Sequence, residues 1–408
     1  MFDNLLYQPV SALLHDDIMQ NRLPGALLLS GPVASGKLTC ALELSRILSC
    51  TGDGVHERGY WLCTCSACRK SKELAFPNVL LAGSRDCILE IKAAKKAFLE
   101  AAMQNASVLA ATRYLFVRAV RKLTMRFSQI LWEGDPQLPK FAPCLQAIDE
   151  ELERIAVEKP LPENEKLVKT CAEIEKQAEK LESGFMYDSL PISQIRRASA
   201  WAHLKSAGGK KVFIIENAES MNEAARNALL KTLEEPPEDT VFVLTTTRRG
   251  AVMPTILSRV RTYTLTERTL AEQQEVLERV FHTTCVPGES GTITRYLQTF
   301  LPVTPEVIHA QAVAFLETVK SAGGSGMTAI SGMVKACAGF EPRVIFRLFL
   351  QSLMTQFTME NASQAEGAAT AVQALRDCYN NVQLYNQTPQ AALERLWRDL
   401  FMALRQRG

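Results

Sequence analysis

The chain has 408 residues, of which 47% are hydrophobic, and a formal net charge of +2 at pH 7. A chain of this length can bury several cores, so about two to four domains are expected, and the near balance of charge restricts any nucleic-acid contact to local patches. It has no run of about 18 apolar residues and no signal-peptide pattern at its N-terminus. Membrane-spanning and secreted proteins are therefore excluded, and we expect a cytoplasmic protein with no membrane partner.

A glycine-containing loop follows the first expected strand. After a short helix near residues 10–18, the strand Ala26–Ser30 leads into Gly31-Pro-Val-Ala-Ser-Gly-Lys37 and a helix from about Leu38 to Leu48. This order matches the phosphate-binding pattern G-x-x-x-x-G-K-[ST], in which backbone N–H groups and the lysine hold phosphates. The candidate nucleotide-binding residues are Gly31, Ser35, Gly36, Lys37, Leu38 and Thr39.

One position of this loop departs from the pattern. The hydroxyl that binds Mg²⁺ should stand at position 38, which is Leu, and Thr39 points about 100° away on a helix. We therefore expect the fold of a phosphate-binding loop with impaired Mg²⁺ binding and hydrolysis; whether it holds ATP stays open.

Four of the eleven cysteines lie close together in the sequence, at positions 50, 63, 65 and 68. Thiolates at such spacing can surround a tetrahedral Zn²⁺, so Cys50, Cys63, Cys65 and Cys68 are predicted to hold a structural zinc. Four protein ligands leave no open position, which argues against a catalytic zinc. Two alternatives stay open: His56 could replace one thiolate, or the thiols could be free.

A helical segment of different composition follows, from about residue 88 to 184. Apolar residues recur at helical spacing over Lys92–Trp132 and Leu145–Leu181, and the break near Gly134–Pro143 predicts an antiparallel helical hairpin. The first arm is basic. It is either a solvated face around an apolar seam or a surface for nucleic acid or a partner.

The stretch from Lys211 to Val260 predicts a strand, a helix and a second strand. The runs Val212–Ile215 and Val241–Leu244 are short and β-branched, and the helix Asn222–Glu235 between them is stopped by two prolines. Polar residues follow both strands at the edge where open α/β sheets bind ligands. They add four candidates for nucleotide binding, namely Glu216, Asn217, Thr246 and Thr247.

The run N-A-L-L-K-T-L-E-E-P-P at Asn227–Pro237, with Ser258-Arg259, resembles the AAA+ module of bacterial DNA polymerase III clamp-loader subunits. The glycine loop and the cysteine knuckle agree with it, and the resemblance covers all of the chain except the helical insertion. It implies an α/β fold with an AAA+ P-loop parallel sheet, a helical lid, a long helical-hairpin insertion and a C-terminal all-helical collar. The expected domains are an AAA+ domain at 1–265 with the knuckle at 50–68 and the insertion at about 88–184, a lid at 266–335, and a collar at 336–408.

Three departures indicate the type of subunit. Active gamma/tau-type ATPases have Asp-Glu where this chain has Glu216 and Asn217, and they have a hydroxyl at the position of Leu38. The lid segment Gly323–Met327 also lacks the arginine of active subunits. The chain therefore resembles the delta-prime type, which does not hydrolyse ATP and supplies an arginine finger to a neighbouring site. That arginine would be Arg259, after Ser258, although it could instead pair with a carboxylate of its own domain.

The resemblance implies a hetero-pentamer with gamma/tau and delta subunits, which loads the sliding clamp on primed DNA. A second hypothesis is a gamma/tau-like ATPase that uses Lys37 and Glu216 with an unusual Mg²⁺ shell. A third, a zinc-stapled ATPase outside replication, is disfavoured by the specificity of the Asn227–Pro237 motif.

Overall fold

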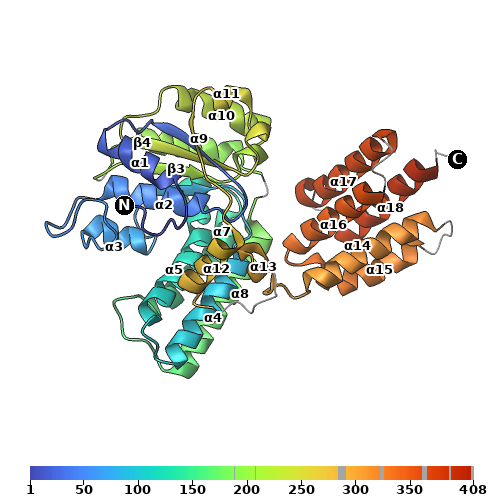
Figure 1. Cartoon of the computed structure of the whole chain (residues 1–408), viewed down its shortest axis with the longest axis horizontal. Coiled ribbons are helices and arrows are strands. Elements are labelled where there is room, and N and C mark those ends of the chain that lie inside the picture. The colour runs from blue at the N-terminus through green and yellow to red at the C-terminus, as the bar shows by residue number, and fades with distance from the viewer. Residues whose placement is uncertain are drawn as a thin grey trace. The chain divides into compact units, whose positions relative to one another are not determined.

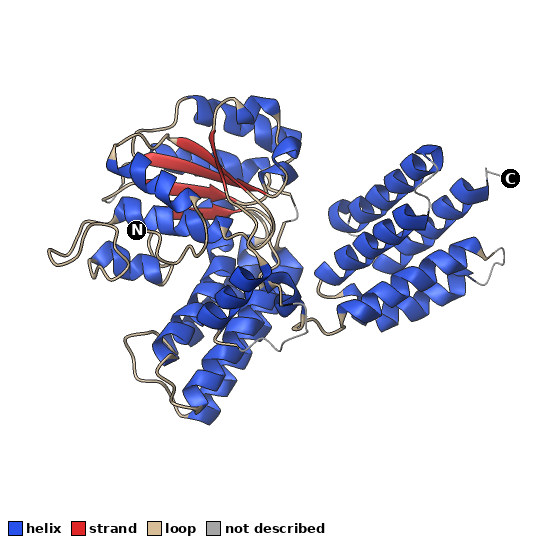
Figure 2. Ribbon diagram, in the orientation of Figure 1, coloured by secondary structure: helices blue, strands red, loops and turns tan. Residues whose placement is uncertain are grey.

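Five parallel strands form the sheet in the first part of the chain (Figure 2). The computed structural model describes residues 1–187, 189–206, 208–283, 291–321, 326–360, 365–385 and 387–405. The strands follow the order β2-β3-β4-β1-β5, and they are β1 (Ala26–Ser30), β2 (Val79–Ala82), β3 (Lys211–Ile215), β4 (Thr240–Thr246) and β5 (Arg261–Thr264). The predicted α/β class is therefore confirmed. The sequence analysis did not predict β2 and β5.

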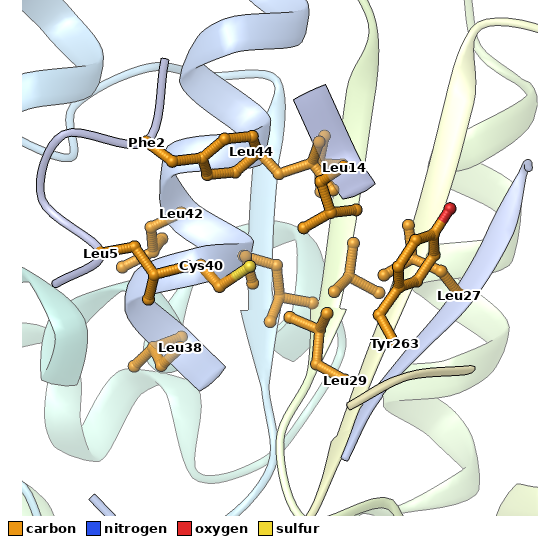
Figure 3. Packing of buried hydrophobic residues seen from close by; sticks show 14 of the residues in the cluster. Phe2, Leu5, Leu14, Leu27, Leu29, Leu38, Cys40, Leu42, Leu44 and Tyr263 are labelled. Carbon is orange, nitrogen blue, oxygen red and sulfur yellow. The ribbon is translucent and has the colours of Figure 1, made fainter. Parts of the chain in front are cut away.

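The core of this part lies on one face of the sheet. Side chains alternate between the two faces of a strand, so Leu27 and Leu29 of β1 point to the same side as Val212 and Ile214 of β3. Figure 3 shows Leu27 and Leu29 among the side chains of the buried helix α2 and of Leu14. Phe213 and Phe242 project to the opposite face, where their rings meet edge to face at 6.1 Å.

Helices cover both faces. α2 (Lys37–Ser49) packs against β1, β3 and β4, whereas α9 (Ile192–His203) packs against β3 and against α10 (Glu223–Glu234). Asn222 caps α10, since its side chain accepts from the N–H of Ala225 at 2.8 Å. The remaining helices of this region are α1 (Val10–Met19), α3 (Ser66–Lys72), the 3-10 turns η2 (Ala218–Ser220) and η3 (Arg249–Ala251), and α11 (Pro254–Leu257).

The insertion is helical, as expected, but each of the two predicted arms is divided (Figure 1). The left-handed backbone of Asn105 turns the chain between the first two helices, and the segment with Pro160 and Pro162 lies between the last two. The insertion therefore packs as two helical pairs, α4 with α5 and α7 with α8. Its elements are α4 (Ile88–Met103), α5 (Leu109–Thr124), η1 (Met125–Phe127), α6 (Gln129–Trp132), α7 (Leu138–Arg154) and α8 (Asn164–Phe185).

The chain divides into two units, residues 1–297 and 298–408. After the sheet, the first unit adds α12 (Leu270–Val276), the π-helical turn η4 (Leu277–Phe281) and α13 (Ile293–Gln298), which ends at the boundary. The second unit contains α14 (Pro305–Lys320), α15 (Gly326–Ala336), η5 (Ala338–Phe340), α16 (Val344–Glu360), α17 (Ala365–Tyr385) and α18 (Pro389–Arg405). Helix α14 packs against α16 and α18, so the structure groups it with the C-terminal helices.

The predicted division at residues 265 and 335 stays a prediction. Residues 323–325 of the lid segment Gly323–Met327 lie outside the described residues. Among the described helices, none combines the length and the apolar character needed to cross a membrane.

Candidate functional site

The glycine loop joins β1 to α2 at the carboxyl edge of the sheet. Gly36 adopts a left-handed conformation with φ of 95°, which glycine takes without strain, and α2 begins at the next residue. Arg268 fastens the loop from outside, because its guanidinium donates to the carbonyl of Ala34 at 2.7 Å and to that of Leu6. The start of α2 and its unpaired N–H groups are thus directed into the loop, which is an arrangement that binds phosphate.

Lys37 has its ammonium group inside this loop. Nζ donates to the carbonyl oxygens of Gly31 at 2.7 Å and Pro32 at 2.5 Å, and it lies 3.4 Å from Oγ of Ser35. Burial lowers the pKa of Lys37 to about 8, although the charge of Glu216 opposes this shift. The lysine therefore remains mostly protonated at neutral pH and supplies a positive charge to the loop.

Leu38 is buried in the apolar core, and Thr39 is half-buried on α2. The position where a Mg²⁺-binding hydroxyl is expected thus holds a hydrocarbon side chain.

Both carboxylate oxygens of Glu216 are occupied by arginines. Glu216 follows β3 directly and is buried; its Oε1 accepts from Nη1 of Arg85 at 3.1 Å, and its Oε2 accepts from Nη2 of Arg126. Burial would raise the pKa of Glu216, but the two guanidinium groups outweigh it and hold that pKa below its ordinary value. Mg²⁺ needs such oxygens for its own octahedral shell, so the residues present do not fit a Mg²⁺ ion at Glu216.

The side chain of Asn217 is fixed by a hydrogen bond to the neighbouring loop. It adopts a left-handed backbone with φ of 53°, a conformation that asparagine tolerates, and its Nδ2 donates to the carbonyl of Ser84 at 2.8 Å. An amide fixed in this way cannot act as a general base.

Thr246 is fully buried at the end of β4, and its hydroxyl accepts from the backbone N–H of Arg248 at 3.0 Å. Thr247 is exposed and binds Oε1 of Glu219 through both its N–H and its hydroxyl. Register places Thr246 beside Ser30, immediately before the glycine loop.

Arg259 and Ser258 lie at the end of α11, near the surface. Nε of Arg259 donates to Oε1 of Glu234 at 2.8 Å, and its Nη1 donates to the carbonyl of Thr255 at 2.7 Å and to Oγ of Ser258 at 3.3 Å. The pairing with a carboxylate of the same domain, which the sequence left open, therefore occurs. Both partners are partly exposed, at 29% and 48% of their side chains, and such pairs contribute only about 0–1 kcal/mol.

The four predicted cysteines meet in one buried cluster. The Sγ atoms of Cys50, Cys63, Cys65 and Cys68 all lie within 4.8 Å of one another. Tetrahedral zinc with Zn–S bonds of about 2.3 Å separates its sulfurs by about 3.8 Å, and the Cys50–Cys63 and Cys50–Cys65 separations are 3.6 and 4.0 Å. The cluster can therefore bind a metal. The four ligand atoms grouped here are all cysteine sulfurs, so His56 is not among them; its Nδ1 pairs with Asp53 at 2.9 Å.

Groups around the cluster donate hydrogen bonds to its sulfurs. The N–H groups of Gly59 and Gly52 approach Sγ of Cys50 at 3.2 and 3.4 Å, and Nη1 of the buried Arg46 approaches Sγ of Cys68 at 3.5 Å. Such donors stabilise thiolates and orient metal ligands.

Comparison with known proteins adds the family. The sequence matches the family described as "DNA polymerase III, delta subunit" over residues 7–130 and 152–269, well over half of its 408 residues. The chain belongs to this family. The expected resemblance to DNA polymerase III clamp-loader subunits is therefore confirmed.

Individual relatives match over short segments. The chain is 54% identical over 52 residues to the DNA polymerase III subunit delta' of Pseudomonas aeruginosa, which covers 13% of this chain and 16% of that protein. It is 47% identical over 58 residues to subunit delta' of Escherichia coli, covering 14% and 17% of the two chains. It is 50% identical over 54 residues to subunit tau of Bacillus subtilis, covering 13% and 10%.

These matches span less than a fifth of each relative's length. A crystal structure of a gamma subunit-related protein from Thermotoga maritima aligns with 57% of this chain and 90% of that chain, with 22% identity and a TM-score of 0.25. Relatives of the delta' and the tau type match with similar identity, so the comparisons support a clamp-loader subunit of either type.

Three arginines of the site were not identified from the sequence, namely Arg85, Arg126 and Arg268. Arg126 lies in the arm that the sequence predicts to be basic. Its position depends on an aromatic cluster: the indole N–H of Trp132 donates to the carbonyl of Arg126 at 2.8 Å, and the ring stacks on Phe127 at 5.4 Å. In the sequence, the signal for a buried arginine was its position directly before Phe127 and close to Trp132.

The basic arm is largely paired within the protein. Lys92 and Lys95 contact Glu175, Arg121 contacts Asp149, and Lys122 contacts Glu90. These cations hold the helices of the insertion together. Whether the arm also contacts nucleic acid or a partner stays a prediction.

Glu182 of α8 anchors the start of α4. Its Oε2 accepts from the N–H groups of Cys87 at 2.7 Å and Ile88 at 3.1 Å. Burial raises the pKa of Glu182 to about 8, outweighing the opposite effect of these N–H donors. The folded-state pKa thus lies above the unfolded value of about 4.3, so its stabilisation is complete below about pH 4 and is lost as the pH rises toward 8.

We expect Glu182→Gln, which resembles the neutral acid, to raise the melting temperature by about 2–4 °C at pH 8 and to change it little near pH 4. Thermal unfolding followed by circular dichroism at both pH values measures this difference. Glu179→Gln is the control, since it removes a partly exposed carboxylate of the same helix that pairs with Lys92. A difference between the Glu182→Gln variant and the wild type that stays constant with pH would contradict the assignment.

Proposed function

We propose that this chain is a delta-prime-like subunit of the DNA polymerase III clamp loader, which does not hydrolyse ATP and supplies Arg259 in trans to a neighbouring ATPase subunit. Its partners are gamma/tau and delta subunits in a hetero-pentamer that loads the sliding clamp on primed DNA. The observation that carries this proposal is the arginine pair on Glu216, which takes both oxygens of the carboxylate that an active site needs for Mg²⁺.

The surroundings of Arg259 support the second half of the proposal. Its ion pair with Glu234 is partly exposed, so it costs little to break, and a guanidinium can bind two phosphate oxygens at once. Val260, the next residue, is buried and fixes the backbone beneath the arginine. Arg259 can therefore exchange a carboxylate of its own domain for a phosphate of the neighbouring subunit.

We also propose that the cysteine cluster holds Zn²⁺ as a structural ion. Four buried thiols within 4.8 Å of one another provide four ligands and leave no position for water, which is typical of a structural site. The ion would fasten the polar loop 51–64 between α2 and α3.

A gamma/tau-like ATPase is the second candidate. The glycine loop with the protonated Lys37 favours it, as does the similarity to subunit tau of Bacillus subtilis. Such an enzyme would have to displace two arginines from Glu216 in every catalytic cycle.

Turnover by the isolated chain separates the two candidates. We expect no ATP hydrolysis above the level of a Lys37→Ala variant, because neither Glu216 nor Asn217 can hold Mg²⁺ or activate water. Release of radioactive phosphate from labelled ATP measures this. Hydrolysis by the wild-type chain that disappears in Lys37→Ala would favour the gamma/tau-like enzyme.

A further inference from the structure

Two guanidinium groups stand at the edge of the sheet where a P-loop site places its divalent cation. Glu216 extends from β3, and the glycine loop extends from β1, with only β4 between these strands. Neighbouring strands are about 4.8 Å apart, so the ends of β3 and β1 are about 10 Å apart, the span of a short polyphosphate chain. Glu216 and Arg85 both act electrostatically on Lys37, which agrees with this proximity.

The backbone is shaped to bring Arg85 here. Gly83, after β2, has φ of 102°, and a Cβ on it would lie 2.3 Å from the carbonyl oxygen of Glu216. Only glycine allows this approach, which also sets Ser84 against Asn217. Arg126 reaches the same place from η1 and donates to the carbonyl of Gly83 at 3.3 Å.

Three cations, Lys37, Arg85 and Arg126, lie around the carboxylate of Glu216, and Glu219 also acts electrostatically on Lys37. Glu90, which Arg85 also contacts, pairs with Lys122. Nε of Arg126 is buried without a hydrogen-bond partner, whereas nearly all buried donors are paired. The guanidinium of Arg126 therefore has one donor that no group of the protein accepts.

We propose that the glycine loop binds a nucleoside di- or triphosphate without a divalent cation, with Arg85 and Arg126 neutralising the phosphates in place of Mg²⁺. The proposal deepens the proposed function, because it assigns a ligand to the site that has lost hydrolysis. Lys37 and the N–H groups of the loop hold the phosphates nearest the loop. The arginines bind the terminal phosphate and remain tethered to Glu216, so the nucleotide acts as a structural ligand that is not consumed.

Magnesium dependence of nucleotide binding tests this proposal on the full-length isolated chain. ADP and ATP are freed of metal on a chelating resin, and no free chelator is added, because it would also extract a metal from the cysteine cluster. Isothermal titration calorimetry with and without MgCl₂ is expected to give dissociation constants that differ by less than about threefold.

Substitutions distinguish a specific role of the arginines from the effect of removing any nearby positive charge. Arg85→Gln is expected to weaken metal-free binding by about tenfold, the effect of one charge-assisted hydrogen bond, and Arg85→Lys should weaken it less. Arg121→Gln, on the neighbouring helix and paired with Asp149, is the matched control and should bind as wild type does. Arg85 is a third exposed, so its replacement is tolerated better than that of the buried Arg126.

Glu216→Gln gives the sharpest contrast. If the arginines bind phosphate, removing the competing carboxylate charge should maintain or tighten binding without Mg²⁺. If Glu216 is a metal ligand, the same change should weaken binding in the presence of Mg²⁺.

Binding that requires Mg²⁺, an affinity unchanged in Arg85→Gln, or no nucleotide binding by the wild-type chain would each overturn the proposal. None of these outcomes bears on Arg259, whose role is measured only in the assembled loader. Failure of this inference is therefore distinguishable from failure of the proposed function.

Discussion

Arg259→Ala is expected to slow ATP hydrolysis at the neighbouring subunit's site by about 10³-fold or more in a clamp loader assembled from the same organism's subunits. The reason is electrostatic. A guanidinium placed against the transferring phosphoryl group stabilises charge that develops in the transition state, and no other group replaces it. Because Arg259 would serve one site of the proposed ring, total ATPase falls by the share of that site, whereas clamp loading falls further if the sites act in sequence. Both rates are measured with primed DNA and the clamp present.

Three further variants define the origin of this effect. Arg259→Lys keeps the charge but loses two-point binding, so it should recover only part of the rate. Glu234→Gln releases the guanidinium from its partner within the domain and should leave the rate equal or higher. Arg249→Ala removes another exposed arginine of the same region and should have no effect. Unaltered hydrolysis and loading with Arg259→Ala, in a complex of normal composition, would show that this arginine serves only its own domain.

The buried strands β1, β3 and β4 were predictable from the sequence, and the edge strand β5 was not. β1, β3 and β4 are buried along their whole length, so every residue is under the same apolar constraint and the runs are easy to recognise. β5 lies at one edge and reads Arg-Thr-Tyr-Thr, with only Tyr263 buried. An edge strand needs apolar residues on one face only, and over four residues that pattern carries almost no information.

The candidate site divides in a similar way. Local motifs located the glycine loop, the cysteine ligands and Arg259, because each depends on residues close together in the chain. The pairs at Glu216 join residues 131 and 90 positions apart, and no local pattern connects such partners. The departure of Glu216-Asn217 from Asp-Glu indicates the loss of the Mg²⁺ ligand and of the general base. Only the fold shows that two arginines bind the carboxylate of Glu216.

Purified protein is expected to contain one zinc ion per chain, and replacing Cys68 by serine should abolish this tight binding. A hydroxyl is a much weaker zinc ligand than a thiolate, and the three remaining sulfurs would lose their common centre. The loop 51–64 has few apolar contacts of its own, so its order depends on the ion. Zinc content follows from atomic absorption or from release to a chromogenic chelator.

Loss of the metal should also appear as local opening of this loop. Arg58 is exposed within it and is fixed by a hydrogen bond from its Nε to the carbonyl of Cys50 at 2.6 Å. Once the ion is removed, trypsin should cleave after Arg58 at least about tenfold faster, because proteolysis follows the population of the open form. Cys144→Ser, which alters a buried cysteine of the insertion, should retain both zinc and resistance to cleavage. If the wild-type chain contains no stoichiometric metal, or if Cys68→Ser resists trypsin as well as the wild type does, the four thiols are free and the loop folds without them.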